Sequence, residues 1–197
     1  VAHAELYAGL VELGVGLIPA GGGCKEMLRR VVSPVMVAHP NADVLPHLQK
    51  AFEAIATAKV STSAKEARDI GFLAADDRIV MNRAHLLGEA KQVALELARS
   101  YTPRRPGKVY AAGRDAHAAL LLGIEGFREA GYATDYDAHI SRKLAYILTG
   151  GAISEPGWVP EQYILDLERE AFLSLVTEPK TMERITHMLQ TNKPLRN

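Results

Sequence analysis

The sequence predicts a mainly α-helical chain, and three observations support this. Apolar residues recur at helical spacing through nearly every segment after residue 23 of the 197-residue chain. Only two stretches, "HAELYA" and "FLAADDRIV", have strand-like character. Several helical segments end at a glycine, the residue most often found just beyond a helix. Because an isolated pair of strands is marginal in water, we expect the rest of the sheet to lie upstream of residue 1, in a domain of which this chain is the carboxyl-terminal part.

Up to residue 71 the apolar spacing predicts three helices. A short helix covers 24–32. A longer one covers 41–60, with Pro46 in its first turn, where an N–H group is not needed. The stretch "STSAKEARDIG" contains a capping box, in which Ser63 is followed three residues later by Glu66. A closing glycine marks the end of this third helix.

The following residues predict a strand or extended connection at 72–80 and a strong amphipathic helix at 82–101. The stretch "TPRRPGK" then interrupts the helical spacing, because its prolines and turn residues disfavour a helix. We therefore divide the chain into 1–101 and 108–197. Further helices are expected beyond this boundary, at Arg114 to Ala130, Asp135 to Thr149, Pro160 to Val176 and Thr181 to Gln190.

Charge and composition exclude several classes of protein. The 23 basic residues balance the 23 acidic residues, so no net charge draws the chain to nucleic acid or to an anionic membrane surface. No apolar run reaches the roughly 18 to 20 residues that span a bilayer, and no secretory signal opens the sequence. The single cysteine, Cys24, fits a reducing compartment, and we expect a cytoplasmic protein.

One acidic residue has an unusual setting. In "GLVELGVGLIPAGGG", residues 9–23, Glu12 lies in an otherwise apolar run that leads to Pro19 and a loop of small residues. It could lie on the exposed face of an edge strand, which is the commoner place for an acidic residue. It could instead be a buried acid or base whose substrate lies against the glycine loop. The flanking residues alone leave both interpretations open.

The stretch "AELYAGLVELGVGLIPAGGGCKEMLRR" resembles the crotonase (enoyl-CoA hydratase/isomerase) superfamily. That family has a Pro-Glu pair, a Gly-x-Ile-Pro turn and a Gly-rich loop that opens a helix. Val11 stands where the family has its proline. The segments "KVSTSAKEARDIGFLAADDRIV" and "AHLLGEAKQVALELA" resemble the family's next segments in the same order. The residues in register with the family turn are Glu12, Gly16, Ile18, Pro19, Gly22 and Gly23.

Residues 101–197 resemble instead the end of the bacterial multifunctional 3-hydroxyacyl-CoA dehydrogenases of fatty-acid β-oxidation, through "LEREAFLSLVTEPKTMERITHMLQTNKPLRN". The resemblance implies the C-terminal half of an α/β crotonase-like fold with extra C-terminal helices. It also implies an acyl-CoA substrate, no cofactor in this part, and NAD bound by upstream domains of the same chain. Because crotonases commonly assemble through their terminal helices, it implies a homo-oligomer as well.

The resemblance also implies the roles of site residues. Glu12 would be the general acid or base for acyl-CoA hydration or double-bond isomerisation, and burial among apolar residues would suit this role. The backbone N–H of Ala20 would contact the reacting water. Both N–H groups that stabilise the enolate, and the second glutamate of hydratases, would lie upstream of residue 1, so we expect the isolated chain to be inactive. The residues expected to contact substrate are Gly16, Pro19, Gly21 and Gly22.

Other features support weaker interpretations. The Gly-rich loop could bind phosphate at the start of a helix, but it lacks the spacing of a nucleotide P-loop. The histidines show no metal-ligand spacing, so no metal site is predicted. Cys24 is expected to be a small buried residue. Arg104, Arg105 and Lys108 are expected in a solvated linker, although they could contact CoA phosphates. The alternative to an enzyme is a non-catalytic helical docking or oligomerisation domain.

Overall fold

The computed structural model describes every residue from Val1 to Asn197, and it is mainly helical, as the sequence predicts. Elements η1 and η3 are 3₁₀ helices, and η2 is one turn of π-helix. In chain order the elements are β1 (Ala2–His3), η1 (Glu12–Val15), α1 (Gly23–Met27), η2 (Leu28–Val32), α2 (Ser33–Ala38), α3 (Leu45–Ala56), α4 (Ala64–Ile70), β2 (Ile79–Val80), η3 (Arg83–His85), α5 (Leu86–Ala98), β3 (Lys108–Ala111), α6 (Gly113–Glu129), α7 (Asp135–Leu148), β4 (Gly157–Pro160), α8 (Glu161–Val176) and α9 (Pro179–Thr191).

Two small sheets contain all the strands. β1 and β2 pair in parallel, with Ala2 opposite Ile79, and β3 and β4 pair antiparallel, with Val109 opposite Val159. The first sheet joins the two stretches that the sequence marks as strand-like, although the first contributes only His3 to β1 and the second only Ile79 and Val80 to β2. The second sheet was not predicted, because strands of four residues are too short to show a clear alternation.

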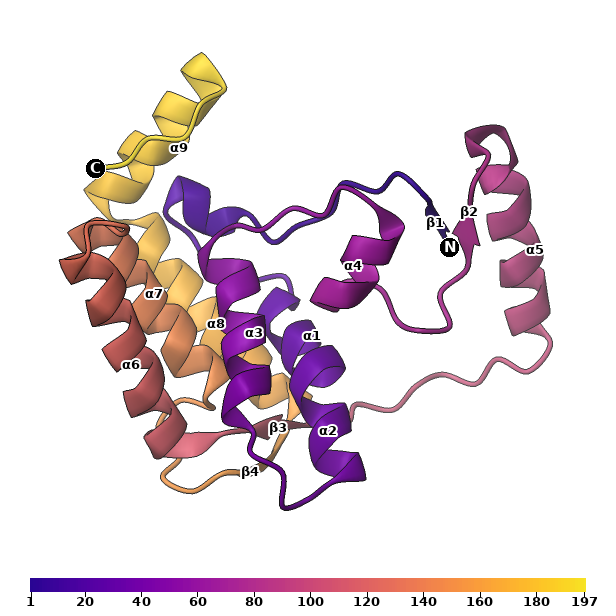
Figure 1. The fold of residues 1–197 in the computed structure, drawn as a ribbon, viewed down its shortest axis with the longest axis horizontal. Helices are drawn as coiled ribbons and strands as arrows, with labels where there is room; N and C mark the ends of the chain where they lie inside the picture. Colours follow the sequence, from indigo (N-terminus) through magenta and orange to yellow (C-terminus); the bar gives the residue numbers. More distant parts are fainter.

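The hydrophobic core lies among α3, α6, α7 and α8 (Figure 1). A single cluster of 27 buried residues includes Leu13 in η1, Leu48 in α3 and Leu175 in α8. α7 buries eight of its 14 residues because it packs against α3, α6 and α8. Helices from both sides of the 102–108 segment therefore share one core. The functional assignment of 1–101 and 108–197 as separate parts stays a prediction.

The first helical segment is longer than predicted. The sequence suggests that it ends at Val32, but α1, η2 and α2 follow one another without a break from Gly23 to Ala38. Pro34 lies in the first turn of α2 and has no N–H to donate to the preceding turn. The π-turn accommodates the missing hydrogen bond, since the N–H of Ser33 donates to the carbonyl oxygen of Leu28, five residues back.

Several predicted helix ends are confirmed. Pro46 lies in the first turn of α3. The Ser63 hydroxyl caps α4 by accepting a hydrogen bond from the N–H of Glu66 at 3.1 Å. Gly131 follows α6 and Gly150 follows α7, and both adopt the positive φ that favours glycine at a helix end.

α5 stands apart from the helical body. In Figure 1 it lies on the far side of β1, β2 and α4, and a long connection leads from it to β3. It forms the amphipathic helix that the sequence predicts, yet it buries none of its residues, and Leu87 is 82% exposed. Every residue of the connection at 101–106 is exposed. No helix of the chain combines the length and apolar character needed to cross a membrane.

Candidate functional site

The residues predicted to form the site all lie on one segment, the turn that leads from η1 to α1. η1 begins at Glu12 and ends at Val15, and Gly16, which follows it, has a φ of 86°. A Cβ atom on Gly16 would lie 2.7 Å from the Thr181 hydroxyl oxygen, so no larger residue fits between η1 and α9. The chain then passes through buried Ile18 and Pro19 before the small-residue loop.

Glu12 lies in this 3₁₀ turn, so its interpretation as an exposed edge-strand residue is wrong. The residue is partly buried, and its Oε2 is the single buried side-chain nitrogen or oxygen atom with no hydrogen-bond partner. No basic side chain pairs with it. An unsatisfied buried acceptor costs about 1–3 kcal/mol. The fold therefore holds this carboxylate at a cost to stability, which calls for a functional or structural explanation.

Cys24 lies close to two carboxylates. It is completely buried, and its thiol donates to the carbonyl oxygen of Pro19 at 3.6 Å. Burial raises the pKa of the Cys24 thiol well above its usual value, and the negative charges of Glu168 and Glu12 raise this pKa further. Cys24 is therefore an unreactive packing residue, as the sequence suggests, even though it lies in the first turn of α1.

Glu168, from α8, occupies the amino-terminal end of α1. Its Oε2 accepts a hydrogen bond from the N–H of Gly22 at 2.7 Å, and its Oε1 accepts one from the N–H of Lys25, also at 2.7 Å. The residue is 0% exposed, and burial raises the pKa of its carboxyl although these N–H groups oppose the change. The loop therefore binds the protein's own carboxylate at the position where a phosphate would bind.

The loop keeps two free donors. Neither Ala20 nor Gly21 donates its backbone N–H to another group of the protein. Ala20 does not adopt a positive φ, so an alanine fits here in place of the family's glycine. Gly21 is exposed, and a Cβ built on it would meet no atom within 4 Å. Of the predicted substrate contacts, Gly22 has its N–H occupied by Glu168, whereas the donors at Ala20 and Gly21 remain available.

A buried arginine behind η1 was missed by the sequence analysis. Arg184, in α9, is 2% exposed, and its Nη1 donates to Asp137 Oδ1 at 2.8 Å and to the carbonyl of Leu13 at 3.5 Å. Its guanidinium lies 5.0 Å from the ring centre of Tyr136. Burial raises the pKa of Asp137, but hydrogen bonds from Thr134 and Arg184 outweigh this and leave the pKa below its usual value. α7 and α9 thus hold the turn that carries Glu12.

The remaining candidates lie outside the η1–α1 turn. Arg105 is exposed in the connection before β3, as expected for a linker, whereas Arg104 forms an ion pair with Glu161 at the start of α8. Lys108 is exposed but is the first residue of β3, so its expected place in a linker is wrong. No group of three or more His, Cys, Asp and Glu side chains is arranged to hold a metal ion.

The sequence of this chain is similar to the sequences of two known proteins. The chain is 46% identical, over 201 aligned residues that cover all of it, to "Probable 3-hydroxyacyl-CoA dehydrogenase" of Bacillus subtilis, and spans 24% of that protein. It is 28% identical over 187 residues, 94% of its length, to "Putative fatty acid oxidation complex trifunctional enzyme" of Rickettsia felis, and spans 22% of it. The chain thus covers about a quarter of each relative. No protein-family profile matches it.

Proposed function

We propose that this chain is part of a fatty-acid β-oxidation enzyme that acts on acyl-CoA thioesters, with Glu12 as general acid or base for hydration or double-bond isomerisation. The names of the two relatives support a role in fatty-acid oxidation. The crotonase-like turn at residues 12–23 supports the finer assignment. In this proposal residues 1–101 complete a crotonase-like module, and 108–197 add its C-terminal helices.

The observation that carries the proposal is the unpaired Oε2 of Glu12. A carboxylate held by an arginine or by several N–H groups would be fixed in its charged form. Glu12 has no such partner at this oxygen, and in this proposal its carboxyl group is the one that moves a proton on the bound ligand. General acid–base catalysis of this kind accelerates a reaction by about a hundred- to ten-thousandfold.

The free N–H groups of the loop fit the same proposal. Ala20 would donate its N–H to the reacting water, and Gly21 leaves space beside it for a ligand. Gly16 and Pro19 would set the direction of the turn, and the N–H of Gly22, bonded to Glu168, would hold it in place. No covalent step is assigned to Cys24, because burial keeps it as a thiol.

The other catalytic groups would come from the rest of a longer protein. The relatives are about four times as long as the chain. The N–H groups that stabilise the enolate, and a hydratase's second glutamate, belong to upstream segments in this proposal. NAD would also bind elsewhere, because the glycine loop opening α1 is already bonded to Glu168 and offers no pyrophosphate site. The isolated chain should therefore be inactive.

The test is a comparison of wild type and Glu12→Gln in the full-length protein. The substitution keeps the shape of the side chain and removes the exchangeable proton. We expect crotonyl-CoA hydration or 3-enoyl-CoA isomerisation to fall by about a hundredfold or more. Glu5→Gln is the matched control, because Glu5 is exposed and its carboxylate accepts only from the Tyr7 hydroxyl. Equal rates in Glu12→Gln and wild type would rule out the proposed role of Glu12.

The alternative of a helical docking domain is favoured by one observation. α5 exposes Leu87, Leu95 and Leu97, and none of its residues is buried. A helix with this pattern would gain stability by packing its apolar face on another surface. A full-length wild type that lacks both activities, but loses its assembly when these leucines are changed to serine, would support docking instead of catalysis.

A further inference from the structure

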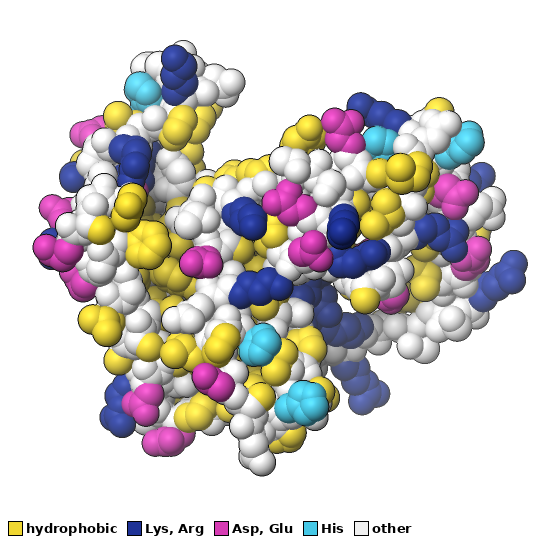
Figure 2. All heavy atoms as spheres, viewed as in Figure 1, with side chains coloured by type: hydrophobic (Ala, Val, Ile, Leu, Met, Phe, Trp, Pro, Cys, Tyr) yellow, Lys and Arg dark blue, Asp and Glu magenta, His cyan; other side chains and the backbone are white.

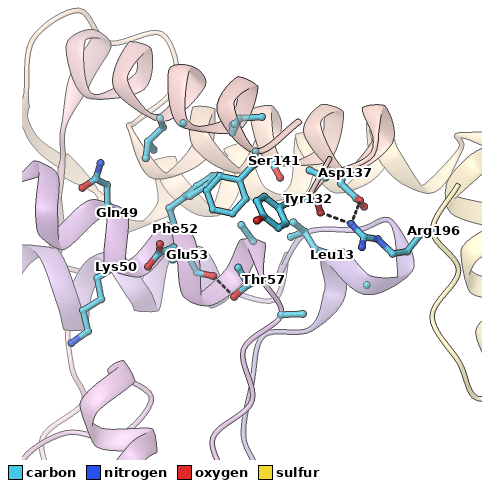
Figure 3. A pocket seen from close by; sticks show the side chains of 18 of the residues that line it. Leu13, Gln49, Lys50, Phe52, Glu53, Thr57, Tyr132, Asp137, Ser141 and Arg196 are labelled. Carbon is cyan, nitrogen blue, oxygen red and sulfur yellow. Dashed lines mark hydrogen bonds and ion pairs between the residues drawn. The ribbon is translucent and has the colours of Figure 1, made fainter. Parts of the chain in front are cut away.

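A groove of about 770 Å³ lies beside the turn that carries Glu12. It is bounded by α3, α6, α7, η1 and the terminal residues 194–196, and Figure 3 shows its interior. In Figure 2, hydrophobic side chains gather in the hollow between α6 and α3, below α9. The volume is within the range of about 300–1,000 Å³ that small-molecule pockets occupy.

Two helix faces form the long walls of the groove. The α3 face runs from Pro46 to Ala56, which corresponds to about 15 Å at roughly 1.5 Å per residue. Phe52 lies in the groove, whereas Lys50 extends away from it (Figure 3). The wall from α6 is apolar and contains no charged side chain; it consists of Ala119, Leu120, Gly123, Ile124 and Phe127.

Polar groups line the groove in two places, on the α3 wall, where they are Gln49, Lys50 and Glu53, and at the end next to η1. Leu13 and Gly14, which directly follow Glu12, line this end together with Asp137 and Arg184. Ser141, one helical turn beyond Asp137, lines the groove, and its hydroxyl, whose oxygen is not fully buried, makes no hydrogen bond within the protein. An unpaired hydroxyl on the groove wall can donate to, or accept from, an oxygen of a ligand.

We propose that this groove binds the aliphatic chain of a fatty acyl group, with its oxygen-bearing end toward Ser141 and η1. The assignment rests on the proposed function, because the acyl group of an acyl-CoA would then extend from the Glu12 turn along α3 and α6. The apolar α6 wall and Phe52 would remove methylene groups from water, which favours binding. A free fatty acid shares this chemistry, and the experiment below separates the two sources.

Gly123 offers a direct test of the groove. It lies on the groove wall in the middle of α6, and a Cβ built on it would meet no atom within 4 Å. Gly123→Leu would therefore fill part of the groove without displacing the protein. Gly126 is the matched control, since it lies in the same helix, also has open space at its Cβ, and does not line the groove. Ala119→Leu is a second blocking variant at another position of the same wall.

The experiment titrates the full-length protein with dodecanoyl-CoA, butanoyl-CoA and dodecanoate by calorimetry. We expect Gly123→Leu and Ala119→Leu to weaken dodecanoyl-CoA binding by about tenfold or more, the equivalent of about two buried methylene groups. Butanoyl-CoA binding should not change, and Gly126→Leu should bind all ligands as wild type does. Dodecanoate binding with the same sensitivity to Gly123→Leu would make the free acid a ligand of the same groove. If Gly123→Leu weakens the binding of dodecanoyl-CoA but not that of dodecanoate, the groove binds the acyl chain of the thioester and not the free acid.

The acyl-binding role of the groove and the catalytic role of Glu12 can be contradicted independently. An active enzyme whose dodecanoyl-CoA affinity is the same in wild type, Gly123→Leu and Ala119→Leu would overturn the groove and leave Glu12 in its role. Chain-length-dependent binding in a protein without hydratase or isomerase activity would support the groove and count against the role of Glu12. Loss of oligomerisation in Gly123→Leu, with unchanged acyl-CoA binding, would show that the groove is a protein interface and would overturn the proposal.

Discussion

Glu168 and Gly22 are 146 positions apart in the sequence, yet Glu168 Oε2 accepts the Gly22 N–H at 2.7 Å. The second oxygen of the same carboxylate accepts the N–H of Lys25. A side chain of α8 therefore caps α1, where the first N–H groups of a helix have no partner within the helix. The glycine-rich loop is thus held by tertiary structure and needs no bound anion to satisfy these donors.

Glu168→Ala should destabilise the protein. The change leaves the buried N–H of Gly22 and that of Lys25 without an acceptor, so we expect a loss of roughly 2–4 kcal/mol in the free energy of unfolding. Urea unfolding followed by circular dichroism measures it. Glu170→Ala, two positions along the same helix and exposed, should change stability by less than about 0.5 kcal/mol. Equal effects of the two variants would show that the cap does not stabilise the fold.

The same carboxylate should make stability depend on pH. Burial raises the pKa of Glu168 above its ordinary value of 4.5, so the folded protein binds this proton more tightly than the unfolded chain does. This contribution to stability therefore increases as the pH falls through the folded-state pKa toward 4.5, and it is lost as the pH rises through the folded-state pKa. Glu168→Gln cannot titrate at this position. The free energy of unfolding of wild type, relative to this variant, should rise as the pH is lowered from about 8 to about 5. A constant difference across this range would contradict the raised pKa.

Gly16→Ala should be more harmful than the same change at Gly14. Gly16 has a φ of 86°, and its Cβ would approach the Thr181 hydroxyl oxygen to 2.7 Å, so we expect a loss of about 1–3 kcal/mol in the free energy of unfolding. Gly14 has no positive φ and open space at its Cβ. Its replacement by alanine should be neutral or slightly stabilising. Thermal unfolding of both variants measures this difference in stability. If Gly16→Ala is as stable as wild type, η1 and α9 can move apart easily.

Most helices were predictable because their signals are local. Pro46, the Ser63 cap and the glycines after α6 and α7 each act within one helical turn. The extension of the first helical segment through Pro34 was not predictable, because proline usually ends a helix and the π-turn that accommodates it leaves no mark in the sequence. The β3–β4 pair was missed for a related reason, since its pairing depends on contacts between distant segments.

The candidate site was predictable in part. Glu12 and the small-residue turn were recognised because they lie within one short segment. Glu168 was not, because an acidic residue in an amphipathic helix normally faces solvent, and its partners are backbone N–H groups that any residue would supply. Arg184 was missed as well, since its contacts with Asp137 and Leu13 form only when α9 packs against α7 and η1.

Arg184 should contribute far more to stability than Arg196, although both arginines contact Asp137. The Arg184 side chain is 2% exposed, so Arg184→Met leaves Asp137 and the carbonyl of Leu13 without their buried donor. We expect the free energy of unfolding to fall by about 3 kcal/mol. Arg196 is 61% exposed and lies 3.4 Å from Asp137, so Arg196→Met should cost less than about 1 kcal/mol.

A double-mutant cycle isolates the interaction itself. Asp137→Asn removes the carboxylate charge that Arg184→Met would otherwise leave without its buried partner, so the double variant should be less destabilised than the sum of the single variants. Urea unfolding of the four proteins gives the coupling free energy between the two side chains. If the two single changes in the free energy of unfolding simply add up in the double variant, the buried pair does not hold α9 against α7. Arg184 would then act only by filling space over Tyr136.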